Sequence, residues 1–207
     1  MEDSIGMALF VAQIKSRFLD SDIGTIVEVG SLDGQDSIYF KQCFPNARVV
    51  AIEGLEENFD DYLDNVTTHG VEWLHRVVSD NSGEVTYHVK DVNGIHGIFN
   101  HGDEYGQQKR TVIACRLDDI FLEIDAMKID VEGATYEVLL GMGKLLDKVK
   151  IMHLETESYP FFKGQKLHAD VAELLSGRFT MTLCTNAYIA QGVQHDSVWI
   201  NNEYLDS

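Results

Sequence analysis

The residues best placed to bind a ligand begin with two glycines that follow a short apolar run. Residues 25–29 read as a strand, Gly30 and Gly34 follow, and a helical pattern begins directly after them. A glycine at a strand end permits a tight turn and a close approach of backbone to ligand, and a helix start offers free N–H groups to an anion. The same spacing also fits a purely structural turn.

An acidic residue at the end of the next predicted strand adds to this pattern. Glu53 lies 23 residues after Gly30. A carboxylate at about that spacing accepts hydrogen bonds from ribose hydroxyls. Leu32 stands where the dinucleotide fingerprint needs a second glycine, so a small anion fits the turn better than a pyrophosphate. Turn and acid together predict a nucleoside with a small anionic tail, which is the shape of S-adenosylmethionine.

A second polar group follows two later strand-like runs. Asp130 and Glu132 end one run, and His153 and Glu155 end the next. Alternation along a strand places each pair on one side of the sheet, where crowding can raise the pKa of a carboxyl or keep the histidine protonated. Asp130, His153 and Glu155 are therefore the candidate catalytic bases. His153 in a buried strand and Glu132 at a helix start also fit purely structural roles.

No metal site is predicted. Carboxylate oxygens suit Mg²⁺, but no ligand spacing in the chain requires a metal. His96 and His101 are expected to be solvated loop histidines, and His195 with Asp196 is expected to form a turn before the last strand.

The order of the predicted elements indicates an α/β fold. Strand-like and helical runs alternate, which predicts one doubly wound, Rossmann-like domain over residues 1–207, with a mainly parallel seven-stranded sheet and an antiparallel C-terminal hairpin. Residues 1–22 should hold a leading helix, and the glycine-rich segment 91–109 a lid loop. The expected strands are 25–29, 48–52, 71–78, 126–130, 150–154, 179–184 and 196–201, with 85–89 and 111–115 as two further strand-like runs.

Charge and composition exclude several classes of protein. The 207 residues carry 16 Lys plus Arg and 34 Asp plus Glu, a net charge of −18. So acidic a chain repels phosphate backbones and anionic membranes, and no apolar run approaches the roughly 18 residues of a membrane span. The three cysteines form no CxxC pair, and the acidic start of the chain lacks the pattern of a signal peptide. A cytoplasmic protein acting on a small molecule is expected.

The segment 128–141, KIDVEGATYEVLLG, carries a specific resemblance. It closely resembles the KIDVEGAE-EVLKG signature of FkbM-type methyltransferases. The run from Glu28 to Ser37 is similar to the family's D-x-G-A-N-x-G-x-x-S motif, and residues 51–53, 77–80 and 117–119 are similar to its FEP, ALSD and TLDD motifs. The chain departs from the family pattern at three positions. Leu32 stands where the family often has Asn, Ser31 where it has Ala, and Gly54 where it has Pro.

The resemblance implies S-adenosylmethionine as cofactor and a hydroxyl group as methyl acceptor, on a sugar, a glycan or a small metabolite. Asp130 would lie where the sulfonium and the acceptor meet. The resemblance places the cofactor among Glu28, Gly30, Ser31, Gly34, Ser37, Glu53, Gly54, Leu55, Val78, Ser79, Asp80 and Asp130.

Two other functions remain compatible with the motifs. A nicotinamide-dependent oxidoreductase would use the same turn and acid, although Leu32 and a missing third glycine oppose it. A non-catalytic nucleoside-binding module would keep Glu53 and lack an acceptor site. Binding of either cofactor, followed by a turnover assay, separates these three functions.

Overall fold

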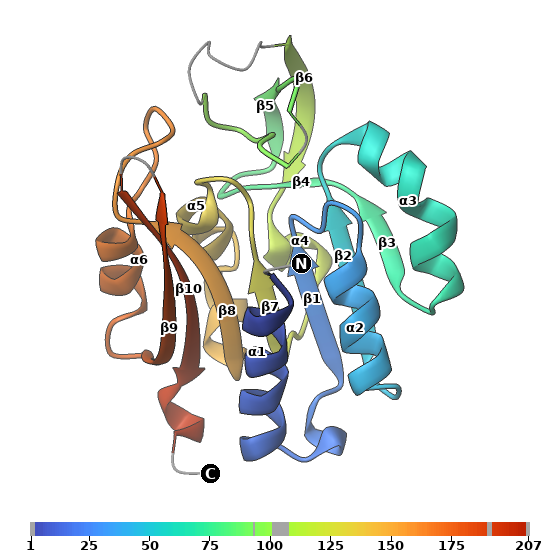
Figure 1. Ribbon diagram of the computed structural model, residues 1–207, viewed down its shortest axis with the longest axis vertical. Coiled ribbons are helices and arrows are strands. Elements are labelled where there is room, and N and C mark those ends of the chain that lie inside the picture. Colours follow the sequence, from blue (N-terminus) through green and yellow to red (C-terminus); the bar gives the residue numbers. More distant parts are fainter. Residues whose placement is uncertain (1–2, 93, 101–107, 190–191, 206–207) are drawn as a thin grey trace.

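Seven strands form the central sheet, in the order β3-β2-β1-β7-β8-β10-β9 (Figure 1). The computed structural model describes residues 3–92, 94–100, 108–189 and 192–205. The first five strands are parallel, and β10 runs antiparallel to both β8 and β9, which confirms the predicted fold. The strands are β3 (Glu72–His75), β2 (Arg48–Glu53), β1 (Thr25–Val29), β7 (Ala126–Ile129), β8 (Ile151–Glu157), β10 (Gly192–Asn201) and β9 (Phe179–Ile189).

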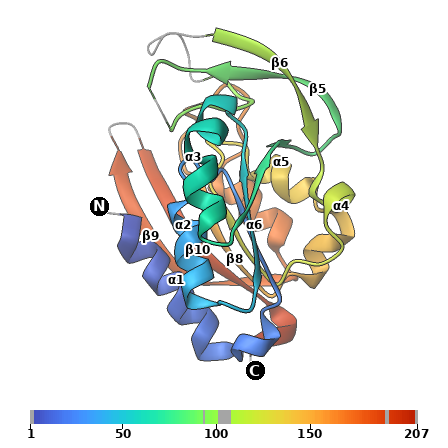
Figure 2. The ribbon, with the colours of Figure 1, turned by 90° about the vertical axis from the view of Figure 1, so that its right-hand side faces the viewer.

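Helices cover both faces of this sheet (Figure 2). One face packs against α1 (Asp3–Arg17), α2 (Gln35–Cys43) and α3 (Glu56–Thr68). The other packs against α4 (Leu117–Ile120), α5 (Thr135–Leu140) and α6 (His168–Leu175). Because both faces are buried, β1 and β2 are nearly continuous apolar runs, as is typical of a parallel sheet.

The leading helix is shorter than predicted. In α1, buried Met7, Phe10 and Ile14 recur at helical spacing and pack on the sheet. The helix ends at Arg17, and the remainder of the expected 1–22 segment includes a short 3₁₀ turn over Asp20–Asp22. Further 3₁₀ turns cover Gly143–Lys148 and Asn202–Tyr204.

The predicted third strand, 71–78, is wrong as a single element. Its first part is β3, which pairs with β2, whereas β4 (Val77–Val78) pairs with β6 (Gln108–Cys115) in a second sheet. The reason is that β2 ends at Glu53, whose carbonyl accepts the last bond from Arg76, so the following residues have no partner in the main sheet. The second sheet, β4-β6-β5, also contains β5 (Gly83–Val89) and lies beyond the carboxyl ends of the parallel strands (Figure 1).

The segment expected as a lid, 91–109, overlaps β6, which begins at Gln108. Residues 93 and 101–107 lie outside the described residues, and with them His101. Two isolated antiparallel β-bridges connect the described part of this segment to other elements: Gly97 pairs with His88, and Asn100 pairs with Lys163. The expectation of a lid therefore remains untested.

The C-terminal hairpin is longer than predicted. β9 and β10 extend beyond the expected 179–184 and 196–201, and β8 continues to Glu157 because β10 provides a partner along its whole length. His195 and Asp196 therefore lie inside β10 and not in a turn, so that expectation was wrong. Over the described residues, none of the helices has the length and apolar character needed to cross a lipid bilayer.

Candidate functional site

The turn after β1 brings the backbone of two strands into close contact. The N–H groups of Gly30 and Ser31 both donate to the carbonyl of Ile52, at 3.0 and 3.1 Å. Gly30 has φ +83°, and a Cβ at this position would lie 1.6 Å from the carbonyl oxygen of Asp130. Only glycine fits this position, because it must accept both a left-handed backbone and the close approach of β7.

Leu32, in the same turn, also has a left-handed backbone, with φ +52°. This conformation costs a residue with a Cβ roughly 1 kcal/mol, and Asn tolerates it better. Replacing Leu32 by Asn should raise the free energy of unfolding by about 0.5–1 kcal/mol in urea titrations. Leu32→Ala is the matched control, since Ala removes the same side chain without favouring this backbone. An equal gain in both variants would contradict the explanation.

Glu53 is held in a fixed orientation by backbone donors. The N–H of Leu32 donates to one carboxylate oxygen at 2.8 Å, and the N–H of Leu55 donates to the other at 2.7 Å. Asn58 adds a longer contact of 3.5 Å. Burial raises the pKa of Glu53, and the two backbone bonds partly offset this rise. Leu55 and Asn58 both donate to Oε1, whereas Oε2 accepts only from Leu32 among the described residues. Oε2 therefore keeps a free lone pair and can accept from a further hydroxyl.

Three polar residues form a row across β1, β7 and β8. Glu28 is in register with Lys128, and Lys128 with His153. The residue two positions earlier in each strand is apolar and packs in the core beneath α1 and α2. Because side chains alternate along a strand, all three polar residues point to the face of the sheet that α1 and α2 cover.

Lys128 is the centre of a buried ion-pair cluster at this row. Its Nζ lies 3.2 Å from Glu28, 2.6 Å from Asp36 and 3.4 Å from Asp130. Burial lowers the pKa of Lys128, but the three carboxylates outweigh that effect and raise it well above its usual range. Burial raises the pKa of Glu28 to about 7, although Lys128 opposes this. Ser37 donates to Glu28 at 2.5 Å, so both oxygens of Glu28 have partners inside the protein.

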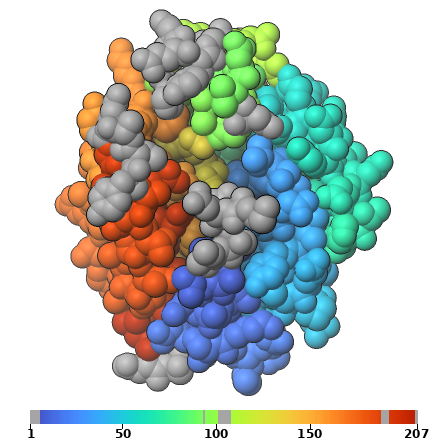
Figure 3. Space-filling view, in the orientation of Figure 1, coloured from blue at the N-terminus to red at the C-terminus, as the bar shows by residue number. Residues whose placement is uncertain are grey.

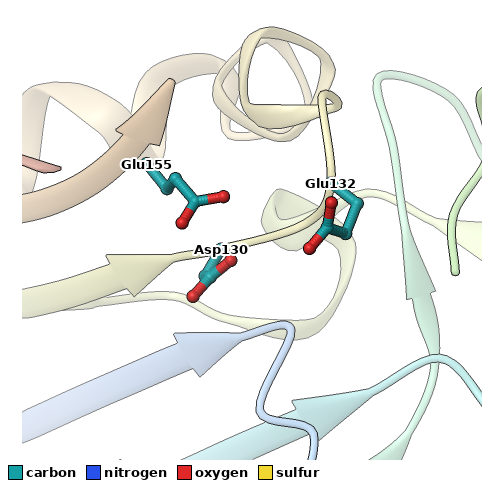
Figure 4. A group of neighbouring side chains, drawn as sticks. All are labelled: Asp130, Glu132 and Glu155. Atoms are coloured by element: carbon teal, nitrogen blue, oxygen red, sulfur yellow. The ribbon is translucent and has the colours of Figure 1, made fainter. Parts of the chain in front are cut away.

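Asp130, Glu132 and Glu155 form what we call the acid group (Figure 4). One oxygen from each lies within 4.8 Å of the others, so a single cation could contact all three. Burial and the neighbouring carboxylates raise the pKa values of Glu132 and Glu155 well above their usual range. Gln194 of β10 donates to Glu155, and Asp196 is in register with it. In both Glu132 and Glu155 burial is the larger cause, and the neighbouring carboxylates add to it.

Glu157 lies two residues after Glu155 in β8. It allows the effect of burial on a carboxyl pKa in this strand to be tested. Burial raises its pKa to about 7 from the ordinary 4.5. The folded protein thus keeps a proton on Glu157 that the unfolded chain releases, and the stability contributed by this group falls as the pH rises from about 4.5 to about 7. Glu157→Gln should therefore raise the free energy of unfolding by about 3 kcal/mol near pH 8 and by much less near pH 5.

The matched control is Glu123→Gln, because Glu123 is exposed and is not among the residues around the carboxylates of the site. It should leave the pH profile of unfolding unchanged. A Glu157→Gln effect of equal size at both pH values would contradict the raised pKa.

One cavity of about 860 Å³ joins these features. It opens as a hollow between the orange C-terminal strands and the blue α2 region, below the green second sheet (Figure 3). Nine of the residues predicted from the sequence line it: Glu28, Gly30, Ser31, Glu53, Gly54, Val78, Asp130, His153 and Glu155.

Five predicted cofactor residues do not line the cavity but support its wall. The side chain of Ser37 is buried against Glu28, and Leu55 holds Glu53 through its backbone. Gly34 packs against Val66 at the start of α2. The other two are Ser79 and Asp80. The Ser79 hydroxyl donates to the Asp80 carboxylate, and the Ser79 N–H donates to the carbonyl of Cys115. The side chain of Arg116 donates to the backbone carbonyl of Asp80.

His153 is the site residue whose expected charge is wrong. Burial and the charge of Lys128 lower its pKa to about 4, so the imidazole is neutral at physiological pH. Its Nδ1 is buried without a hydrogen-bond partner among the described residues, and its ring packs against Phe10 at 5.5 Å between centroids. The histidine lines the cavity but stands beside Lys128, outside the acid group.

Several residues of the cavity wall carried no sequence signal. Tyr87 reaches it from β5, and its hydroxyl would lie 3.0 Å from a Cβ at Gly54. This contact gives a physical reason for a glycine where the FkbM pattern has proline. Arg76, Thr185 and Gln194 also line the wall. Each of these residues lies in or beside a strand whose predicted bounds differ from the observed ones. With the correct bounds, the alternation of side chains between the two faces of a strand would have pointed to them.

Comparisons with known proteins identify a family from the sequence and a fold from the structure. The sequence model of the "Methyltransferase FkbM domain" matches residues 28–187. No curated protein sequence matches the chain significantly. Among solved structures, a precorrin-6y C5,15-methyltransferase from Geobacter metallireducens is similar, with a TM-score of 0.55 and 13% identity over 95% of this chain and 87% of that one.

Two further similar structures were determined with S-adenosylmethionine (SAM) bound. Magnesium protoporphyrin IX methyltransferase from Synechocystis has a TM-score of 0.54 and 14% identity over 95% of this chain and 78% of that one. The O-methyltransferase TomG of tomaymycin synthesis from Streptomyces achromogenes also has a TM-score of 0.54 and 14% identity, over 96% of this chain and 79% of that one. At these identities the likeness shows the fold.

Proposed function

The chain belongs to the FkbM methyltransferase domain family, and from that premise we propose that it methylates a hydroxyl group of a sugar, a glycan or a small metabolite. The observation that carries the proposal is a single cavity with the Gly30 turn and the Glu53 carboxylate at one part of its wall and the acid group at another. One side can hold a nucleoside, and the other can hold the group that is methylated.

The described residues fit S-adenosylmethionine as the methyl donor. Glu53 presents the free lone pair of Oε2 where a ribose hydroxyl can donate, and Gly54 and Tyr87 border the space for adenine. The hydroxyl of Ser31 is buried on the wall with no partner among the described residues, so it can bind the methionine part. When bound, this cofactor supplies a methyl group on a positively charged sulfur, which keeps the electron pair as the methyl group leaves.

Asp130 is the group we assign to the acceptor's hydroxyl proton. It lies in the acid group, and its carboxylate is 3.4 Å from the ammonium nitrogen of Lys128. Burial and the neighbouring carboxylates raise the pKa of Glu155, and His153 is a weak base with a pKa of about 4. Both remain alternatives to be tested by substitution.

Glu53→Ala should weaken S-adenosylmethionine binding at least ~10-fold, because bonds to a charged acceptor contribute roughly 1.5–3 kcal/mol each. The variant should also unfold about 2 kcal/mol more easily, since the N–H groups of Leu32 and Leu55 lose their partner. Titration calorimetry and urea unfolding measure the two effects. Arg48→Ala, at the exposed start of the same strand, is the control for binding. An unchanged dissociation constant for Glu53→Ala would remove Glu53 from the site.

Two other functions were compatible with the motifs. The family membership opposes a nicotinamide-dependent oxidoreductase. A non-catalytic nucleoside-binding module would have no use for a group of carboxylates on the same cavity wall, so the acid group favours an enzyme. Micromolar binding of NAD without binding of S-adenosylmethionine would overturn the proposal.

The direct experiment is mass spectrometry of the purified protein for carried-over S-adenosylmethionine or S-adenosylhomocysteine. Calorimetry with S-adenosylmethionine and with NAD follows, and then release of S-adenosylhomocysteine in the presence of hydroxylated acceptors. The proposed setting is the cytoplasm, with a small-molecule or glycan acceptor and no nucleic acid or membrane partner, since a net charge of −18 opposes polyanionic surfaces.

A further inference from the structure

A thiol, an amide and an imidazole lie together on the C-terminal hairpin, on the face turned away from the cavity. Cys184 and Asn186 belong to β9, and His195 belongs to β10, where it is in register with Asn186. Thr185 and Asp196, their neighbours along the two strands, line the cavity. Because side chains alternate between the two faces of a strand, Cys184, Asn186 and His195 share the opposite face. We call these three residues the hairpin group.

The heteroatoms of the hairpin group converge on one point. Sγ of Cys184 lies 3.3 Å from Oδ1 of Asn186 and 3.8 Å from Nδ1 of His195. Oδ1 and Nδ1 are 2.8 Å apart. A sulfur, an oxygen and a nitrogen thus form a triangle small enough for a single ion to contact all three atoms.

The size of this triangle is close to that of three ligands around Zn²⁺. Zinc binds thiolate sulfur at about 2.3 Å, imidazole nitrogen at about 2.0–2.1 Å and oxygen at about 2.0–2.2 Å, in tetrahedral geometry. Tetrahedral angles at those lengths place the ligand atoms roughly 3.4–3.6 Å apart. The two sides that include sulfur differ from these values by about 0.3 Å or less, and the nitrogen–oxygen side by about 0.6 Å. Rotations of the three side chains can supply changes of this size while the strands stay paired.

His195 is supported by a second imidazole, in the way that metal-binding histidines are held by neighbouring side chains. His168 belongs to α6, which lies beside the hairpin (Figure 1), and its ring centroid is 4.3 Å from that of His195. Nδ1 of His168 is hydrogen-bonded to the Thr156 hydroxyl at 2.8 Å, which fixes that ring. Burial lowers the pKa of His195, so its imidazole is neutral at physiological pH. The neutral form is the one that binds a metal.

The hairpin group is not arranged as a nucleophile with its base. In a thiol–imidazole–amide triad, the amide orients the ring through one nitrogen while the other nitrogen receives the thiol proton. Here Cys184 and Asn186 both contact the same nitrogen of His195. Burial raises the pKa of Cys184, so the thiol keeps its proton until a cation displaces it. The arrangement therefore suits a ligand set better than a covalent catalyst.

We propose that Cys184, Asn186 and His195 bind Zn²⁺ through Sγ, Oδ1 and Nδ1, with a water molecule as the fourth ligand. On binding, the thiol proton passes to solvent, and the imidazole carries its proton on Nε2. Sulfur and imidazole nitrogen favour Zn²⁺ over Mg²⁺ and Ca²⁺, which prefer sets of oxygen ligands. The ion and the thiolate together add one positive charge to a chain of net charge −18.

A Zn²⁺ ion at this position cross-links β9 and β10 directly behind the cavity wall. Thr185 and Asp196 are adjacent in sequence to the proposed ligands, so their backbone is held by the same ion. We expect the hairpin amides to exchange more slowly with solvent when Zn²⁺ is bound. The inference goes beyond the proposed function and does not depend on the identity of the methyl acceptor.

The test uses the full chain, reduced and freed of metal, with Co²⁺ as a spectroscopic substitute for Zn²⁺. A thiolate bound to Co²⁺ gives a charge-transfer band in the near ultraviolet, and intense visible bands indicate a four-coordinate ion. We expect Co²⁺ to produce both signals in the presence of excess Mg²⁺, which competes for sites made only of oxygens. Equimolar Zn²⁺ should then remove them. The absence of a charge-transfer band at saturating Co²⁺ would overturn the proposal.

Variants locate the ion. Cys184→Ser should abolish the charge-transfer band, and His195→Ala should weaken Zn²⁺ binding ~10-fold or more in competition with a chromogenic chelator. Cys43→Ser removes another half-buried thiol, and Glu155→Gln removes a member of the acid group. Both controls should keep the band and the affinity. A band that survives Cys184→Ser, or one that is lost in Glu155→Gln, would place the ion elsewhere and overturn the assignment.

Unfolding measurements show whether a variant fails for a trivial reason. Cys184 and His195 are only partly buried, so urea unfolding of the metal-free Cys184→Ser and His195→Ala proteins should resemble that of the metal-free parent. Zn²⁺ should raise the melting temperature of the parent and leave that of both variants unchanged. An equal rise in all three proteins would contradict the proposed ligands.

Discussion

Gly30→Ala is expected to lower the free energy of unfolding by roughly 3 kcal/mol or more, the largest stability effect predicted for this chain. The new Cβ would fall 1.6 Å from the carbonyl oxygen of Asp130, so β1 and β7 must move apart where the cavity wall depends on both. The left-handed backbone at φ +83° adds its own cost. Cofactor binding should be lost together with stability, as seen by urea unfolding and calorimetry.

Gly177→Ala is the matched control. Gly177 has nearly the same backbone, with φ +79°, but a Cβ there meets no atom within 4 Å. Its substitution should cost only the left-handed penalty of about 1 kcal/mol. Equal losses in the two variants would show that the contact between Gly30 and β7 contributes nothing.

Asp130→Asn is expected to reduce turnover by about 10²–10⁴ while leaving the affinity for S-adenosylmethionine nearly unchanged, the usual share of a general base. Asparagine keeps the shape of the side chain but cannot accept the hydroxyl proton. Single-turnover rates with an identified acceptor, together with calorimetry of the cofactor, separate chemistry from binding.

Asp36→Asn controls for the charge around Lys128, because Asp36 contacts the same ammonium at 2.6 Å. It should have a much smaller effect on turnover than Asp130→Asn. A parallel fall of affinity and turnover in Asp130→Asn would make this residue a cofactor contact. If Asp130→Asn, His153→Gln and Glu155→Gln all keep near-full turnover, catalysis depends on positioning alone and the assignment of a base is wrong.

The residues proposed to hold the cofactor could be selected from the sequence because they follow local patterns. The Gly30 turn, Glu53 and the strands before them lie within 30 residues and are defined by glycine, acid and apolar periodicity. A parallel sheet then brings consecutive strand ends together in a predictable order. The residues between β1 and β2 could therefore be placed before any coordinates were known.

The other half of the site depends on pairings between distant segments. Glu155 meets Asp196 and Gln194 only because β8 continues to Glu157 against an antiparallel β10. Nothing near residue 155 reveals that extension, and the polar residues at 194–196 resemble a turn. Tyr87 was missed for the same reason, since the second sheet that presents it forms only after β3 and β4 separate at Arg76.

The residues that line the two parts of the cavity come from two separate stretches of the sequence. The polar side chains assigned to the cofactor come from residues 28–87, and those of the acid group come from residues 130–155. Recombination between relatives at a point after β6 would therefore exchange the acid group as one inherited unit and keep the segment that carries the Gly30 turn and Glu53.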